Sequence, residues 1–291
     1  MGEVGRFPEW VEAIVFDLDG TLVETELLKA RSYAKVAQEL HECVPEDRLR
    51  LLQSDSDCQK TIRDVQSERE EILHPIVAPA TISEGQKCAD RAMKVFLTNL
   101  GATSEYIARK LVDELEIEPL LRPAMERFGE EEPWKALYKL RKEMYYDTFA
   151  TEKNLYESRY PEALKIVEYA RQSGIPLAVA TSSSTGDAER VLEALRIRSD
   201  FKFVVGRDQV SKAKPDPEIY LKAVKLLGAS PEKSLAFEDS VTGLTAGLAA
   251  HMHVVAIASP FTKDSLQAQA LHPQHLVAYD PAAIWKAIHV A

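Results

Sequence analysis

Short runs of β-branched and other apolar residues recur near the start of the chain and again in its last part. Such continuous apolar runs predict strands that are buried on both faces, which is typical of parallel sheets. The expected strands are Ala13–Phe16, Leu177–Ala180, Phe203–Val205, Leu235–Phe237 and Val254–Ile257.

Between the later runs, the apolar positions follow the period of a helix. One helix is expected to open at Pro161 and to stop at Gly174, and another to begin around Pro217 and to stop at Gly228. A third is expected from about Asp187 to Leu195. Strands that alternate with helices predict an α/β fold with a doubly wound, mostly parallel sheet.

Residues 24–159 lack the strand pattern and have a helical period throughout. The apolar stripes of this segment are Leu27, Ala30, Ala34 and Ala37; Ile107, Leu111 and Leu115; and Trp134, Leu137, Tyr138 and Met144. This pattern predicts an all-helical domain, residues 24–159, inserted into a sheet domain of residues 1–23 and 160–291. Each domain is long enough to hold a core of its own.

The composition narrows the class of protein. The chain has 291 residues, of which 45% are hydrophobic, and a formal net charge of −10, so we expect no nucleic-acid partner. Its longest apolar runs fall far below the roughly 18 residues of a membrane span, and its start lacks the apolar stretch of a signal peptide. Three widely spaced cysteines indicate reduced thiols and a cytoplasmic protein. Nothing in the sequence indicates an oligomeric state.

Charged and hydroxyl side chains follow the first four expected strands. Asp17 and Asp19 follow the first, Thr181–Ser184 the second, Lys214 the third, and Glu238 with Asp239 the fourth. In open α/β sheets, ligands bind at the edge formed by the carboxyl ends of the strands. Each group alone also has a structural explanation, as a turn, a helix cap, a solvated lysine or a helix N-terminus.

Taken together, these residues predict a metal site and a phosphoryl site. Four carboxylates at one sheet edge would raise one another's pKa unless a hard cation with oxygen ligands held them, and Mg²⁺ fits that description. Hydroxyls, backbone N–H groups and a lysine beside such a metal suit a phosphoryl group.

In this order and at these positions, the residues resemble the four motifs of the haloacid dehalogenase superfamily. The motifs are Asp17-Leu18-Asp19-Gly20-Thr21, Thr181-Ser182, Lys214-Pro215 and Glu238-Asp239. They cover the sheet domain, about half of the chain. The residues that surround Lys214 and Glu238 are similar to the branch that contains beta-phosphoglucomutase and small-sugar phosphatases.

The resemblance implies a role for each motif residue. Asp17 is expected to be the nucleophile and Asp19 the general acid/base, while Thr181, with Ser182 beside it, and Lys214 hold the phosphoryl oxygens. Mg²⁺ is expected on Asp17, the Asp19 carbonyl and Asp239, with Glu238 in support. The dehalogenases of this superfamily lack the second carboxylate, so Asp19 favours phosphoryl transfer over dehalogenation.

The chain also departs from the mutases of this branch. Lys29 stands where the mutases have a histidine, and Ser104, in Gly101-Ala102-Thr103-Ser104, stands where their helical cap has an arginine. The helical domain is longer than the usual cap, with the excess around residues 41–100. Lys29 is either a contact to the leaving group or a solvated lysine. Lys139, Arg141 and Lys142 form a basic cluster beside Tyr138, which either faces the site or, the favoured alternative, belongs to an exposed helix face.

We therefore expect a Mg²⁺-dependent phosphatase of a small phosphorylated metabolite, with a sugar phosphate favoured, that acts through an aspartyl-phosphate. One alternative is a phosphosugar mutase like beta-phosphoglucomutase. Another is a binding module without turnover or a receiver-like domain. The binding module is disfavoured because every expected chemical residue is present, and a receiver is much shorter.

Overall fold

The computed structural model describes residues 7–42, 82–99, 102–259, 262–268, 275–278 and 281–290. The chain divides into two compact units, Met1–Lys29 with Asp147–Ala291, and Ala30–Tyr146. We call them the sheet unit and the helical unit. Their boundaries lie inside the range 24–159, and the assignment of this range as a cap stays a prediction.

A six-stranded sheet, in the order β3-β2-β1-β4-β5-β6, forms the centre of the sheet unit, and every strand pair in it is parallel. The α/β, doubly wound fold expected from the sequence is therefore confirmed. The strands are β1 (Ala13–Phe16), β2 (Leu177–Ala180), β3 (Phe203–Val205), β4 (Ser234–Glu238), β5 (His253–Ile257) and β6 (His275–Ala278). The sequence analysis found the first five, within one residue at each end, and missed β6.

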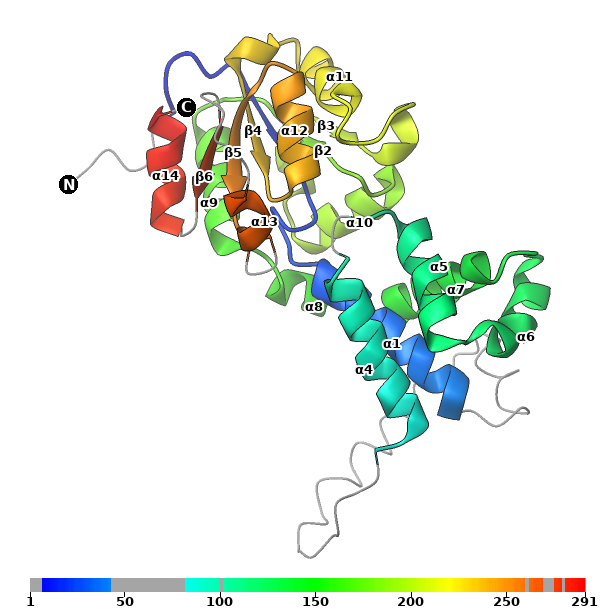
Figure 1. Cartoon of the computed structure of the whole chain (residues 1–291). Helices are drawn as coiled ribbons and strands as arrows, with labels where there is room; N and C mark the ends of the chain where they lie inside the picture. The colour runs from blue at the N-terminus through cyan, green and yellow to red at the C-terminus, as the bar shows by residue number, and fades with distance from the viewer. Residues whose placement is uncertain are drawn as a thin grey trace, which may run out of the picture. The chain divides into compact units, whose positions relative to one another are not determined.

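Helices lie on both sides of this sheet (Figure 1). The helices of the sheet unit are α8 (Glu152–Glu157), α9 (Pro161–Gln172), α10 (Thr185–Ala194), α11 (Glu218–Leu227), α12 (Val241–Ala249), α13 (Lys263–Gln267) and α14 (Pro281–Val290). As the sequence predicts, α9 begins with a proline, and Gly174, just beyond its end, has a φ of +71°. Gly228 ends α11 in the left-handed conformation.

The strands contribute alternate side chains to the two faces of the sheet. On one face, Val15 and Ala236 pack in a buried cluster with Tyr220 of α11 and Leu244 of α12. On the other, the Phe16 and Phe237 rings stack with their centroids 4.8 Å apart. Both faces of the sheet are therefore covered, and the carboxyl ends of its strands are the place for polar side chains.

The helical unit has a separate core. Its helices are the greater part of α1 (Glu26–Glu42), α4 (Glu84–Leu97), α5 (Ser104–Leu115), α6 (Glu118–Phe128) and α7 (Pro133–Met144), with the π-helical turn η1 (Tyr145–Phe149) following α7. The expected stripes pack here, since Ala30, Ala37, Leu111 and Leu137 all belong to one buried cluster.

The helical unit contains several residues that the sequence analysis discussed. Thr103, in the segment without the mutase arginine, is the N-cap of α5, and its hydroxyl accepts a hydrogen bond from the Tyr106 N–H. The expectation of an exposed face at Lys139–Lys142 is wrong for Arg141, which is 8% exposed. Cys88 is a buried free thiol. Residues 43–81, which hold most of the excess length, and Cys43, Cys58 and Gly101 lie outside the described residues.

Among the helices that the structure describes, none is both long and apolar enough to cross a membrane.

Candidate active site

The site forms at the carboxyl ends of the three central strands. Phe16 of β1 pairs with Val179 of β2 on one side and with Phe237 of β4 on the other. The next residue, Asp17, therefore lies level with Ala180 and Glu238, and its N–H continues the ladder by donating to the Phe237 carbonyl at 2.9 Å. Parallel pairing thus brings residues more than 200 positions apart in the sequence to one edge.

Three buried carboxylates meet at this edge. Asp17, Glu238 and Asp239 each offer an oxygen, and these oxygens lie within 4.8 Å of one another. Gly20 makes room for the group: it has a φ of +91°, and a Cβ built on it would lie 2.1 Å from Asp239 Oδ2. Only glycine adopts that conformation readily and leaves this space. The oxygen donors are those that Mg²⁺ prefers, so the residues fit this cation.

Lys214 lies against two of these carboxylates and has its side chain 5% exposed. Its Nζ donates to Asp17 Oδ1 at 2.7 Å, to Glu238 Oε1 at 2.6 Å and to the Ala180 carbonyl at 2.9 Å. An ammonium group has three N–H donors, and these contacts use all three. Lys214 thus ties together the ends of β1, β2 and β4.

Tyr220 of α11 is a site residue that the sequence analysis missed. Its buried hydroxyl donates to Glu238 Oε1 at 2.5 Å and lies 3.4 Å from Lys214 Nζ. The Lys214 Nζ also lies 4.9 Å from the centre of the Tyr220 ring. The only signal in the sequence was a tyrosine next to Ile219 on the buried face of the expected helix.

The second oxygen of Glu238 is held by the start of α12. Oε2 accepts hydrogen bonds from the Asp239 N–H and the Ser240 hydroxyl, each at 3.1 Å. Gly243 allows this approach, because a Cβ there would lie 1.9 Å from the Glu238 carboxyl. Glu238 is therefore fixed by the protein at both oxygens. This leaves Asp17 and Asp239 as the less constrained carboxylates.

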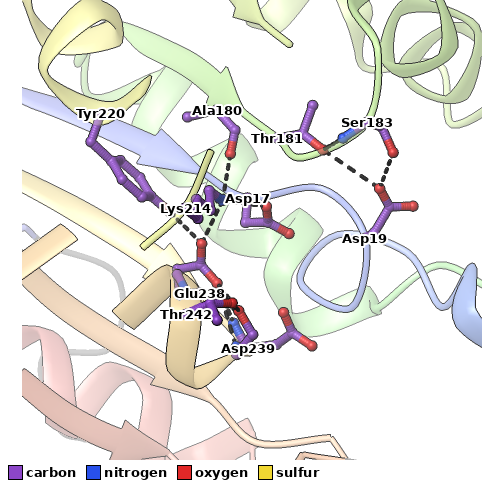
Figure 2. A network of polar contacts seen from close by, with 12 residues as sticks. Asp17, Asp19, Ala180, Thr181, Ser183, Lys214, Tyr220, Glu238, Asp239 and Thr242 are labelled. Carbon is purple, nitrogen blue, oxygen red and sulfur yellow. Dashed lines mark hydrogen bonds and ion pairs between the residues drawn. The ribbon is translucent and has the colours of Figure 1, made fainter. Parts of the chain in front are cut away.

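Asp19 lies on the other side of Asp17 from this group, turned toward Thr181 and Ser183 (Figure 2). The Ser183 hydroxyl donates to Asp19 Oδ2 at 2.6 Å, and the Thr25 hydroxyl donates to Oδ1. Lys29 Nζ lies 3.0 Å from Oδ1. Ser183 belongs to the expected row of hydroxyls, Thr181–Ser184, but had no role of its own, and Thr25 was not singled out in the sequence. The structure thus places the Asp19 carboxyl apart from the cluster of three.

The remaining expected residues differ in their surroundings. Thr181 is buried, and its hydroxyl accepts from the Ser183 N–H at 3.1 Å and lies 3.5 Å from Asp19. Ser182 is exposed beside it. Lys29 is not an isolated solvated lysine, because it also pairs with Glu26 at 2.6 Å.

Burial and neighbouring charges shift the pKa of several carboxyls. Burial, together with the Glu238 charge, raises the pKa of Asp17 to about 7 against the opposing effect of Lys214. Burial and the charges of Asp17 and Glu238 raise the pKa of Asp239 well above its usual value. For Asp19 burial is outweighed by Lys29 and the hydroxyl donors, and its pKa is lowered. An excess of buried negative charge therefore lies at Asp17 and Asp239, where a divalent cation would compensate it.

Comparison with known proteins agrees with this geometry. The sequence model of the haloacid dehalogenase-like hydrolases matches residues 11–251. The chain belongs to this family. The match contains all four motifs and confirms the resemblance that the strand ends indicate.

Several curated relatives carry a phosphatase activity in their names. The phosphorylated carbohydrates phosphatase of Thermotoga maritima is 28% identical over 240 residues, 82% of each chain. The bifunctional riboflavin kinase/FMN phosphatase of Arabidopsis thaliana is 35% identical over 116 residues, 40% of this chain and 30% of the relative. Protein CbbY of Rhodobacter capsulatus is 33% identical over 106 residues, 35% of this chain. The chain spans only 30% and 47% of the last two relatives.

Solved structures share the fold. A beta-phosphoglucomutase from Clostridium difficile covers 96% of this chain and is itself covered to 97%, with a TM-score of 0.54 and 15% identity. CbbY from Rhodobacter sphaeroides in complex with phosphate covers 94% of this chain and is itself covered to 95%, with a TM-score of 0.53 and 22% identity. At these identities the solved structures show the shared fold.

Proposed function

We propose that this protein is a Mg²⁺-dependent phosphatase that hydrolyses a small phosphorylated metabolite, with a sugar phosphate the favoured substrate, through an aspartyl-phosphate on Asp17. The observation that carries the proposal is the buried group of Asp17, Glu238, Asp239 and Lys214 at one sheet edge, with Asp19 two residues after Asp17. The phosphorylated carbohydrates phosphatase similar over 82% of this chain supports the choice of substrate class.

In this proposal Mg²⁺ is held by Asp17, the Asp19 carbonyl and Asp239, with Glu238 fixing their surroundings. The bound cation would supply positive charge next to the phosphoryl oxygens. Lys214, Thr181 and Ser182 hold and orient the same phosphoryl group. Such donors stabilise the negative charge that develops on the phosphoryl oxygens in the transition state.

Asp17 attacks phosphorus with one carboxylate oxygen, and the bond between phosphorus and the ester oxygen of the substrate breaks. Asp19 gives a proton to the departing alcohol. Water then attacks phosphorus of the aspartyl-phosphate while Asp19, now ionised, accepts its proton, so inorganic phosphate leaves and Asp17 is restored. The proton on Asp19 in the first step has to be regained against a lowered pKa. The Asp19 carboxyl must therefore leave its contact with Lys29, or that contact must weaken, when substrate binds.

The helical unit, in this proposal, selects the substrate. The net charge of −10 supports a small metabolite rather than a nucleic acid as partner, and the cysteine pattern supports a cytoplasmic location.

The test is hydrolysis of p-nitrophenyl phosphate, followed by the absorbance of the released nitrophenolate. Wild type and Asp17→Asn are compared at equal protein concentration, each with Mg²⁺ and with EDTA. We expect turnover only in the wild type with Mg²⁺. Equal rates in EDTA would refute the metal requirement, and equal rates in Asp17→Asn would refute the nucleophile. A panel of phosphorylated sugars then identifies the preferred substrate.

The mutase alternative predicts a different product. With glucose 1-phosphate and glucose 1,6-bisphosphate as activator, phosphorus NMR would show glucose 6-phosphate forming faster than free phosphate. We expect the reverse, because Ser104 stands where the helical cap of the mutases has an arginine, and Lys29, a point charge already paired with Asp19 and Glu26, does not replace that guanidinium.

A further inference from the structure

Arg141 is a buried cation that the proposed reaction does not use. It lies in the last turn of α7, within the helical unit, and is 8% exposed. Its guanidinium carbon lies 5.1 Å from the centre of the Tyr33 ring and 5.0 Å from that of the Tyr145 ring. The two aromatic rings therefore hold the charged end of the side chain in a defined position.

This guanidinium has no anionic partner within the part of the chain that the structure describes. Its Nε is buried and forms no hydrogen bond. The more exposed cations nearby are paired: Arg127 contacts Glu143 at 2.7 Å, and Lys139 contacts Glu130 at 2.7 Å. A buried charge is normally paired, because removal from water is costly without compensation. The faces of aromatic rings attract a cation but supply no full negative charge.

We propose that Arg141 is the centre of an anion-binding site in the helical unit, which takes the phosphate or carboxylate group of a small metabolite. A guanidinium presents a planar fork of donors that matches an oxyanion with two parallel hydrogen bonds. Contacts with the Tyr33 and Tyr145 rings hold this fork in place. Tyr145 is also the first residue of the π-helical turn η1, and such turns are frequent at functional sites. The site does not depend on turnover and goes beyond the proposed function.

The first test compares thermal melting of wild type, Arg141→Met and Arg122→Met in EDTA, with and without inorganic phosphate. Arg122 is an exposed arginine of the same unit and serves as the control. Without phosphate, we expect Arg141→Met to melt at or above the wild type, because an uncompensated buried charge is removed. At phosphate tenfold above Kd, the folding equilibrium constant of wild type and of Arg122→Met should rise about elevenfold from this site, and Arg141→Met should lose that factor. Phosphate binding at the sheet edge affects all three proteins equally.

The second test observes the arginine directly. In protein labelled with ¹⁵N-arginine, the Nε–H resonance of Arg141 is identified by its loss in Arg141→Lys, which also serves if the methionine variant fails to fold. Titration with phosphate should move this resonance saturably. Titration with acetate distinguishes a site for carboxylates from one selective for phosphate. A resonance unmoved by both anions, or an equal phosphate response in wild type and Arg141→Met, would overturn the proposal and make Arg141 a packing residue.

Discussion

Removal of the Tyr220 hydroxyl tests whether the contacts beneath the site stabilise the fold. Tyr220→Phe keeps the ring on the buried face of α11 and deletes only the donor to Glu238 Oε1 at 2.5 Å. A hydrogen bond to a charged group contributes about 1.5–3 kcal/mol, and the partner left behind here is a fully buried carboxylate. We therefore expect the free energy of unfolding to fall by about 1.5–3 kcal/mol. For a unit of this size that corresponds to a melting temperature lower by about 3–12 °C.

The assay is thermal and urea unfolding of metal-free protein, with Tyr156→Phe as the matched control. Tyr156 is 40% exposed, and its ring contacts with Arg159 and Arg196 survive the change. The control should stay within about 0.5 kcal/mol of the wild type. A Tyr220→Phe protein as stable as the control would refute the reasoning, because it would show that Glu238 does not need the hydroxyl.

Four further predictions concern the proposed chemistry. Asp17→Asn should abolish release of phosphate from p-nitrophenyl phosphate, while its circular dichroism spectrum stays that of the wild type; measurable steady turnover would exclude Asp17 as nucleophile. Asp19→Asn should lower kcat by about 10²- to 10⁴-fold through loss of acid/base help, and a wild-type rate would contradict that role. Mg²⁺ at a hundredfold excess over Kd should stabilise the wild type by about 2.7 kcal/mol, measured by thermal melting. Mg²⁺ should stabilise Asp239→Ala less, and equal stabilisation of the two proteins would argue against the metal site. The folded-state pKa of Asp17 is raised to about 7, so its contribution to the stability of metal-free protein is full at low pH and is lost as pH rises through 7. Melting temperatures from about pH 5 to 8 should therefore show a stabilisation by Mg²⁺ that grows with pH, and a constant effect would contradict this.

The sequence was sufficient to predict five of the six strands that the structure describes, and the sheet edge at which the polar side chains gather. Parallel strands that are covered on both faces need continuous apolar runs, and such runs are visible without a structure. Because the carboxyl ends of parallel strands share one edge, Asp17, Thr181 and Glu238 could be placed together from their positions after the runs. Strand β6 escaped because it begins with a histidine and follows no recognisable helix signal.

The contacts that tune the site could not be predicted in the same way. Tyr220, Ser183 and Thr25 act through hydrogen bonds to carboxylates whose direction depends on side-chain rotamers and on the space left by neighbours. Arg141 looked like part of an exposed basic helix face, because its neighbours Lys139 and Lys142 are lysines. Its burial depends on the Tyr33 ring, which comes from a helix more than 100 residues earlier in the chain.

The hydrogen bonds of Lys214 limit how it can serve a phosphoryl group. All three of its donors are used, two by the carboxylates of Asp17 and Glu238 and one by the Ala180 carbonyl. A phosphoryl oxygen can therefore be bound only if one of these acceptors gives way. Glu238 is fixed at both oxygens, and the Ala180 carbonyl lies at the end of a central strand, so Asp17 is the acceptor most free to change. Its release from Lys214 would leave an oxygen of Asp17 available to attack phosphorus, which couples the binding of the phosphoryl group to the exposure of the proposed nucleophile.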